Sequence, residues 1–235
     1  MERRDFIRVC AASALGLGAE HAFAARDAQP RQYARAQLVD DGGQPLRASR
    51  LAIGENHVFH YPFEGTPCFL LNLGKPTAQN VALKTRDGGA YQWPGGVGPQ
   101  RAVVAYSAIC SHQLTYPTRQ ISFISYRDQS TASKISKPHM IHCCSEHSEY
   151  DPAAGARVMG GPAPQPLCAI LLDHDRATDA LYATGTLGGE LFNTFFSKYE
   201  MRLALEYGSS RAQQQVSGRA AVTALAQFCK QQVKC

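Results

Sequence analysis

Short apolar and alternating runs, separated by turn residues, dominate most of the chain. Residues 57–61 alternate between apolar and polar, whereas residues 68–73 and 102–106 are almost entirely apolar, as in a fully buried strand. Gly, Pro and Asp lie between these runs and are densest over residues 88–98. Further strands are predicted at residues 37–39, 121–126, 167–172 and 180–184. The pattern therefore predicts an all-β domain of short strands.

The C-terminal part has a different pattern. Phe192, Phe195 and Phe196 fall at helical spacing, and residues 199–207 then alternate as a half-buried strand does. We expect a short helical turn that runs into a strand. Residues 209–235 are expected to form a linker and a C-terminal helix. The apolar stripe of that helix would be Val222, Leu225, Ala226, Cys229 and Val233.

The first 25 residues are typical of an export signal. Arg3 and Arg4 form a twin-arginine pair, an apolar stretch follows from Val9 to Ala19, and residues 22–24 supply a cleavage site of small residues. The twin-arginine route carries folded proteins, so a cofactor can be inserted before export. We expect a periplasmic protein. An uncleaved signal would anchor it weakly to the inner membrane, because the stretch is shorter than the span of about 20 residues; an ordinary amphipathic first helix is the alternative.

The length, charge and Cys content of the chain limit the classes of function that it can have. The chain has 235 residues, 44% of them hydrophobic, which allows one main domain, predicted at residues 36–208. The formal charge of +5 is spread along the sequence without a basic run, which argues against nucleic-acid binding. Residues 127–137 are expected to be a polar surface segment. Eight Cys point either to an oxidising compartment or to a bound metal.

Two short stretches combine Cys with His. They are Cys110-Ser111-His112 and Cys144-Ser145-Glu146-His147, and each lies in a segment of turn-like composition. Two thiolates and two imidazoles can hold an iron–sulfur cluster, or a zinc ion in a closed tetrahedral site. A Pro-rich loop that contains Pro162 and Pro164 follows the second stretch.

The two boxes and the Pro loop together resemble a Rieske protein, over roughly residues 38–208. The resemblance implies a small antiparallel β-sandwich with an inserted cluster-binding part at about residues 102–170. It also implies a 2Fe-2S cluster, with one iron held by Cys110 and Cys144 and the other by His112 and His147. Further roles are implied for Ser148 and Tyr150, as hydrogen-bond donors to sulfur, and for Pro162 and Pro164, as a rigid loop that shields the cluster.

The remaining cysteines leave alternatives open. Quinol-oxidising Rieske proteins carry a disulfide between the two cluster loops, and Thr115 and Glu146 occupy its positions here. Cys143 is an inert thiol, a disulfide partner or, if the loop is shifted by one residue, the true ligand. Cys229 and Cys235 are candidates for a disulfide. Cys68 and Cys168 lie in apolar strands and are expected in the core.

The resemblance implies an electron-transfer subunit rather than a stand-alone enzyme, so no catalytic residue is predicted. Two settings are compatible with it. One is the iron–sulfur subunit of a quinol-oxidising cytochrome bc-type complex, with cytochrome subunits and quinol as partners. The other is the small subunit of a periplasmic molybdenum oxidoreductase such as arsenite oxidase, with a molybdopterin subunit as partner.

Overall fold

The computed structural model describes residues 29–128, 137–208 and 210–235. The predicted export signal at residues 1–25 lies outside the described residues. No helix in the described ranges is long and apolar enough to cross a membrane.

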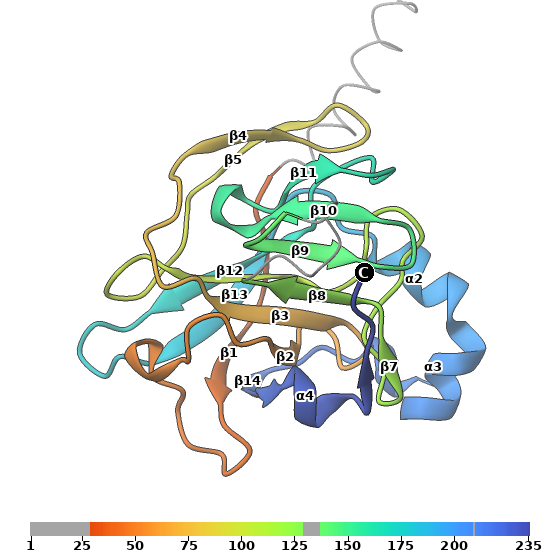
Figure 1. The fold of residues 1–235 in the computed structure, drawn as a ribbon. Helices are drawn as coiled ribbons and strands as arrows, with labels where there is room; N and C mark the ends of the chain where they lie inside the picture. Colours follow the sequence, from red (N-terminus) through yellow and green to blue (C-terminus); the bar gives the residue numbers. More distant parts are fainter. Residues whose placement is uncertain (1–28, 129–136, 209) are drawn as a thin grey trace, which may run out of the picture.

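An eight-stranded sheet forms the body of the protein, in the order β14-β1-β13-β12-β6-β3-β2-β15 (Figure 1). All neighbouring strands are antiparallel except β1 and β14. Strands β14 and β15 lie at opposite edges of this sheet, yet only Val222 separates them in the sequence. The sheet must therefore curl until its two edges approach each other, as in a barrel. Its strands are β1 (Arg31–Val39), β2 (His57–His60), β3 (Pro67–Asn72), β6 (Val103–Ser107), β12 (Ala169–His174), β13 (Leu181–Leu187), β14 (Gly218–Ala221) and β15 (Thr223–Ala224).

A second sheet is inserted between β6 and β12. The chain leaves the main sheet after Ser107 and returns at Ala169, and the residues between form a four-stranded antiparallel sheet in the order β11-β10-β9-β8. Its strands are β8 (Ile124–Arg127), β9 (Met140–Cys143), β10 (Ser148–Asp151) and β11 (Arg157–Gly160). The predicted all-β class with an inserted subdomain is therefore confirmed. Two small pairs complete the strands, β4 (Val81–Lys84) with β5 (Ala90–Trp93), and β7 (Ile121–Ser122) with β16 (Gln231–Gln232).

Strand β3 shows why some runs are apolar throughout. Phe69 and Leu71 pack into a core between the main sheet and the inserted sheet, whereas Cys68 and Leu70 pack into a second core on the other face. Successive side chains of a strand point to opposite faces, so a strand buried on both faces needs no polar positions. Cys68 and Cys168 are both buried, as predicted.

Three α-helices follow or interrupt the last strands in the described part of the chain. They are α2 (Phe192–Lys198), α3 (Glu200–Tyr207) and α4 (Leu225–Phe228). The strand predicted at residues 199–207 is wrong, because this segment is the helix α3. Leu203 packs beside Tyr199 and Tyr207 at helical spacing, whereas Met201 and Leu205 are 83% and 88% exposed. Good helix-forming residues such as Glu, Met, Arg, Leu and Ala decide the structure here over an accidental alternation.

The last residues of the chain belong to the sheets. Strand β14 pairs with β1, β15 pairs with β2, and β16 pairs with β7. The predicted C-terminal helix is present but short: it is the single turn α4, and Val222 and Val233 of the expected stripe lie outside it. Backbone pairing with three strands, β1, β2 and β7, holds residues 218–232 to the sheets.

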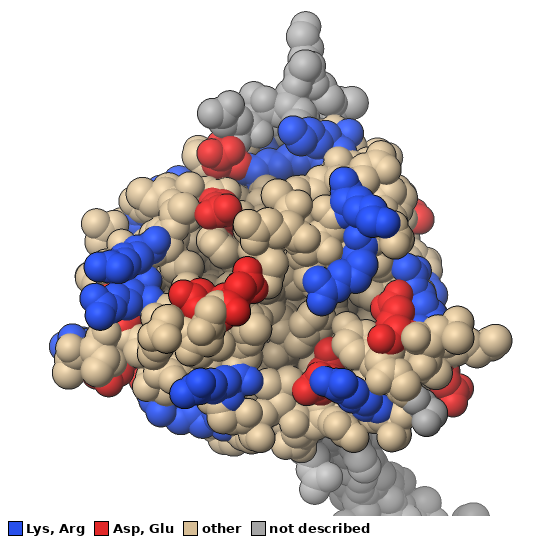
Figure 2. Space-filling model, turned by 90° about the horizontal axis from the view of Figure 1, so that it is seen from below, with Lys and Arg blue, Asp and Glu red and all other residues tan. Residues whose placement is uncertain are grey.

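Charged side chains do not form a patch of one sign on the face drawn in Figure 2. Lys and Arg are interspersed there with Asp and Glu, and some of the acidic side chains lie near the middle of this face. Several of the exposed charges are paired on the surface, such as Arg35 with Asp173 and Arg202 with Glu206. A face of this kind lacks the continuous basic track that would follow a nucleic-acid backbone.

Tyr106 joins the two sheets through a buried hydrogen bond, so its loss should weaken the fold. Its hydroxyl donates to the carbonyl of Pro152 at 2.8 Å. We expect Tyr106→Phe to lower the free energy of unfolding by about 1–3 kcal/mol, because the Pro152 carbonyl would stay buried without a partner. Tyr61→Phe is the control, since the Tyr61 hydroxyl is buried without a partner among the described residues. Urea unfolding of both variants measures the effect; an equal loss in the two would contradict it.

Candidate functional site

Cys110 and Cys143 meet in the core between the two sheets. Cys110 follows β6, Cys143 is the last residue of β9, and both side chains are completely buried. A hydrogen bond between the Cys143 thiol and the Cys110 sulfur lowers the pKa of Cys110 despite the opposing effect of burial. The same contact, reinforced by burial, raises the pKa of Cys143. The pair is therefore arranged so that one sulfur carries a negative charge.

Backbone amides surround the two sulfur atoms in the same way. The Cys110 sulfur accepts hydrogen bonds from the backbone N–H groups of His112 and Gln113, two and three residues further on. The Cys143 sulfur accepts from Ser145 and Glu146, again two and three residues further on. Successive amides that point at one atom form a nest that favours an anion. Each loop is thus preorganised to hold a thiolate.

Tyr150 of β10 completes the surroundings of Cys110. Its hydroxyl lies 3.2 Å from the Cys110 Sγ and also accepts the Ser111 backbone N–H at 3.2 Å. Burial raises the pKa of Tyr150, and the nearby Cys110 adds to this, so the hydroxyl stays protonated and can donate to the sulfur. The Tyr150 hydroxyl therefore lies within hydrogen-bond distance of the Cys110 sulfur, and its role beside a cluster stays a prediction.

The Pro-rich loop is tied to the first Cys loop. The Ser111 hydroxyl donates to the Gln165 carbonyl at 2.7 Å, and the Gln165 side chain in turn donates to the Gly189 carbonyl at 2.9 Å. Pro162 and Pro164 themselves are exposed. A shielding role for these two prolines remains a prediction, but the loop that carries them is fixed at Gln165.

Two buried polar atoms beside the thiol pair lack a hydrogen-bond partner among the described residues. They are the Ser148 Oγ, at the start of β10, and the His112 Nδ1, two residues after Cys110. A buried polar atom without a partner costs about 1–3 kcal/mol. An iron–sulfur cluster would satisfy both atoms, because a sulfide could accept from the Ser148 hydroxyl and an iron could bind the His112 Nδ1. The part of the site around the two thiols therefore fits the implied cluster.

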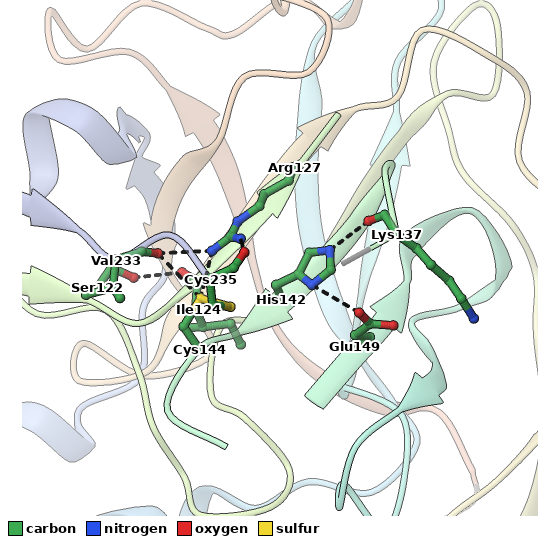
Figure 3. Close-up of a disulfide and its surroundings, with 9 residues drawn as sticks. All are labelled: Ser122, Ile124, Arg127, Lys137, His142, Cys144, Glu149, Val233 and Cys235. Atoms are coloured by element: carbon green, nitrogen blue, oxygen red, sulfur yellow. Dashed lines mark hydrogen bonds and ion pairs between the residues drawn. A yellow bond between two sulfur atoms is a disulfide. The ribbon is translucent and has the colours of Figure 1, made fainter. Parts of the chain in front are cut away.

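The prediction that Cys144 is the second thiolate ligand is contradicted. Its sulfur is bonded to that of Cys235, 91 residues further along the chain, and a disulfide sulfur is no thiolate (Figure 3). Adjacent residues at a strand end point in opposite directions, so Cys143 faces the core while Cys144 faces the C-terminus. Of the alternatives left open for Cys143, the geometry favours the ligand. The pairing of Cys229 with Cys235, left open by the sequence, is not formed, because Cys229 is free and buried and Cys235 is bonded to Cys144.

The place of His147, the second predicted imidazole ligand, is less defined than that of His112, the first. Glu146 and His147 both lie exposed on the turn between β9 and β10, and His112 is half-buried. Counted from Cys143, Glu146 is the third residue and His147 the fourth, so the spacing expected from Cys144 no longer applies. No group of three or more His, Cys, Asp or Glu side chains in the described ranges is placed to hold one metal ion.

Arg127 is a residue of this region that sequence reasoning missed. It was expected in a polar surface segment, yet it lies at the end of β8 and is only 8% exposed. Its guanidinium donates to the Cys144 sulfur at 2.7 Å, to the Val233 carbonyl at 3.1 Å and to the Cys235 carbonyl (Figure 3). Ser111 and Gln165 were also missed, and Cys235 was considered only as a partner of Cys229, because the partners of all three are distant in sequence.

A comparison with known protein families finds no match for this chain. Among solved structures, the chain is similar to the soluble domain of the Rieske protein II (soxF) from Sulfolobus acidocaldarius. The two share 24% sequence identity, with a TM-score of 0.44. The similarity covers 67% of this chain and 82% of that one.

Gly161 should be essential for the approach of the Pro loop to the second Cys loop. A Cβ there would lie 2.3 Å from the His147 carbonyl oxygen and 2.6 Å from the Ser148 Cα, and the residue has a φ of +80°. We expect Gly161→Ala to cost about 3 kcal/mol of unfolding free energy, from backbone strain and this overlap together.

Gly88 is the matched control for that change. It has a φ of +84°, and an added Cβ would meet nothing within 4 Å. Gly88→Ala should therefore cost only the left-handed backbone strain of about 1 kcal/mol. Chemical unfolding of both variants measures the difference, and equal losses would show that the loop does not depend on this contact.

Proposed function

We propose that this protein is a Rieske-type electron carrier with a 2Fe-2S cluster. The proposal rests chiefly on the contact between the buried Cys110 and Cys143 thiols, with the Tyr150 hydroxyl on one of them. These two thiols would hold one iron, and His112 and His147 would hold the other. The Ser148 Oγ and the His112 Nδ1 support the same assignment, because both are buried without a hydrogen-bond partner among the described residues. Ser148 pairs with Cys143 across β9 and β10, and His112 follows Cys110 by two residues.

The residues of the site have separate tasks in such a carrier. A cluster of this type takes up and releases one electron at a time, and imidazole ligands raise its potential. The backbone amides of the two loops and the Tyr150 hydroxyl point at sulfur, so they favour the state with more negative charge. The two sheets keep water from the thiols. His112 is half-buried and His147 exposed, so electrons would be exchanged with a partner at that edge.

We propose a periplasmic location, reached by the twin-arginine route. The Cys144–Cys235 disulfide supports it, because disulfides persist in oxidising compartments. An inner-membrane anchor through an uncleaved signal belongs to the same proposal. The partner would be a redox protein, either cytochrome subunits of a quinol-oxidising bc-type complex or the molybdopterin subunit of an arsenite-oxidase-like enzyme. A neighbouring reading frame for a cytochrome b or for a molybdopterin subunit discriminates between these settings.

The ligand assignment is tested by electron paramagnetic resonance of the dithionite-reduced protein, with iron and sulfide analysis. The wild type should contain two iron and two sulfide per chain, the stoichiometry of a 2Fe-2S cluster, and give a Rieske-type signal. Cys143→Ser should lose the signal, whereas Cys144→Ser should keep its shape. Stoichiometric zinc without iron would instead support a structural zinc site. A signal that survives Cys143→Ser but disappears in Cys144→Ser would overturn the assignment.

The same spectra test the second imidazole. His147→Ala should abolish the signal, because one iron would lose a ligand, and Glu146→Gln should leave it unchanged. If Glu146→Gln alters the signal and His147→Ala does not, the carboxylate rather than the imidazole completes the site.

A further inference from the structure

The C-terminal segment 231–235 is fixed against the second Cys loop by three kinds of interaction. Its backbone pairs with β7, where the amides of Gln231 and Val233 donate to the carbonyls of Gln120 and Ser122 at 3.1 and 2.9 Å. The Cys144–Cys235 disulfide ties its end to the loop. Arg127 donates to two of its carbonyls. Only the disulfide among these can be opened chemically and closed again.

Among the described cysteines, the two of the disulfide are the ones that an external thiol can reach from solvent. Cys144 and Cys235 are both half-buried, whereas the five free cysteines in these ranges are all buried. Disulfide exchange requires a thiolate to reach one of the two sulfur atoms from solvent. The described cysteines therefore offer one place where an external thiol can react without unfolding the core.

Arg127 makes the two sulfur atoms of the disulfide unequal. Its guanidinium lies 2.7 Å from the Cys144 Sγ and also donates to the Cys235 backbone oxygen. A negative charge that appears on the Cys144 sulfur when the S–S bond breaks would be met by this cation. Cys144 is accordingly the better leaving group and Cys235 the sulfur that is attacked.

We propose that the Cys144–Cys235 disulfide is a thiol-exchange site, opened by a dithiol and closed by the reverse exchange with the disulfide form of that dithiol, which releases or fastens the C-terminal segment 231–235. In the opening reaction, one thiolate of the dithiol bonds to the Cys235 sulfur and displaces the Cys144 thiolate. The second thiol of the dithiol then displaces Cys235 and closes the dithiol's own disulfide. The dithiol loses two electrons and two protons, and Cys144 and Cys235 gain them.

Opening the disulfide also changes which thiols are available beside Cys110. While Cys144 is bonded to Cys235, its side chain is held away from the core and Cys143 alone faces Cys110. Once the bond is open, Cys143 and Cys144 are adjacent thiols on one loop, and the disulfide no longer ties the end of β9 to the C-terminal segment. This consequence for the cluster rests on the proposed function, whereas the exchange reaction and the release of the segment do not.

Hydrogen exchange with and without dithiothreitol tests the proposal on the full native chain, and alkylation with mass spectrometry reports the state of each cysteine. Dithiothreitol should open Cys144–Cys235 under native conditions and raise amide exchange at Val233 and Gln231 about tenfold or more, while β3 stays protected. A disulfide that remains closed, or that opens without faster exchange, would overturn the proposal.

Variants separate the disulfide from general loosening. Cys235→Ser should show the fast exchange without any reductant, and dithiothreitol should change it no further. Cys229→Ser is the matched control, because Cys229 lies two residues before the segment but is a free thiol that donates to the Leu225 carbonyl at 3.2 Å. Its exchange should match the wild type. Fast exchange in Cys229→Ser as well would mean that any change near the segment releases it, and would contradict the specific role given to the disulfide.

The monothiol glutathione tests the direction of the reaction. A mixed disulfide should be trapped on Cys235, since Cys144 leaves; trapping on Cys144 would overturn the role given to Arg127.

Iron loss from the loaded protein separates this inference from the proposed function. Cys235→Ser should lose iron several-fold faster than the wild type without any thiol present. If release of the segment is observed but iron loss is unchanged, the exchange site stands and its effect on the cluster fails. If neither protein binds iron, the proposed function fails and the exchange site stands.

Discussion

The contact between the Cys110 and Cys143 sulfur atoms is the interaction on which the site depends. Two ionisable groups in an apolar core are costly unless the structure stabilises the charge that one of them carries. Here four backbone amides and the Tyr150 hydroxyl point at the two sulfur atoms. Both sheets are needed for this, because Cys110 follows the main sheet and Cys143 ends a strand of the inserted one. The barrel-like main sheet therefore serves as the support against which the second thiol is placed.

A disulfide and hydrogen bonds hold the end of strand β9 on the side that faces away from the core. Cys144 points away from the core, where Cys235 and Arg127 hold it. The chain thus uses two neighbouring cysteines for different purposes, one for the site and one for a tether to the C-terminus. The C-terminal residues, which pair with β1, β2 and β7, belong to the architecture of the site rather than to an appendage.

Local sequence information was sufficient for some parts of this arrangement and not for others. The buried strands near Cys68 and Val103 follow from apolar runs, and the loop after Cys110 from its turn-like composition. The pairing of β9 with β8 and β10 decides whether Cys143 or Cys144 faces the core. No local sequence pattern predicts this pairing. The partner of Cys144 is 91 residues away, and the burial of Arg127 follows from that distant contact. Helix α3 was missed because alternation and helix propensity disagreed, and propensity prevailed.

Anomalous diffraction at the iron absorption edge, from crystals of protein isolated with its metal, tests the central claim most directly. The account predicts two iron peaks, one of them bonded to the sulfur atoms of Cys110 and Cys143, with continuous density between Cys144 and Cys235. Iron bonded to Cys144, with Cys235 unpaired, would contradict it.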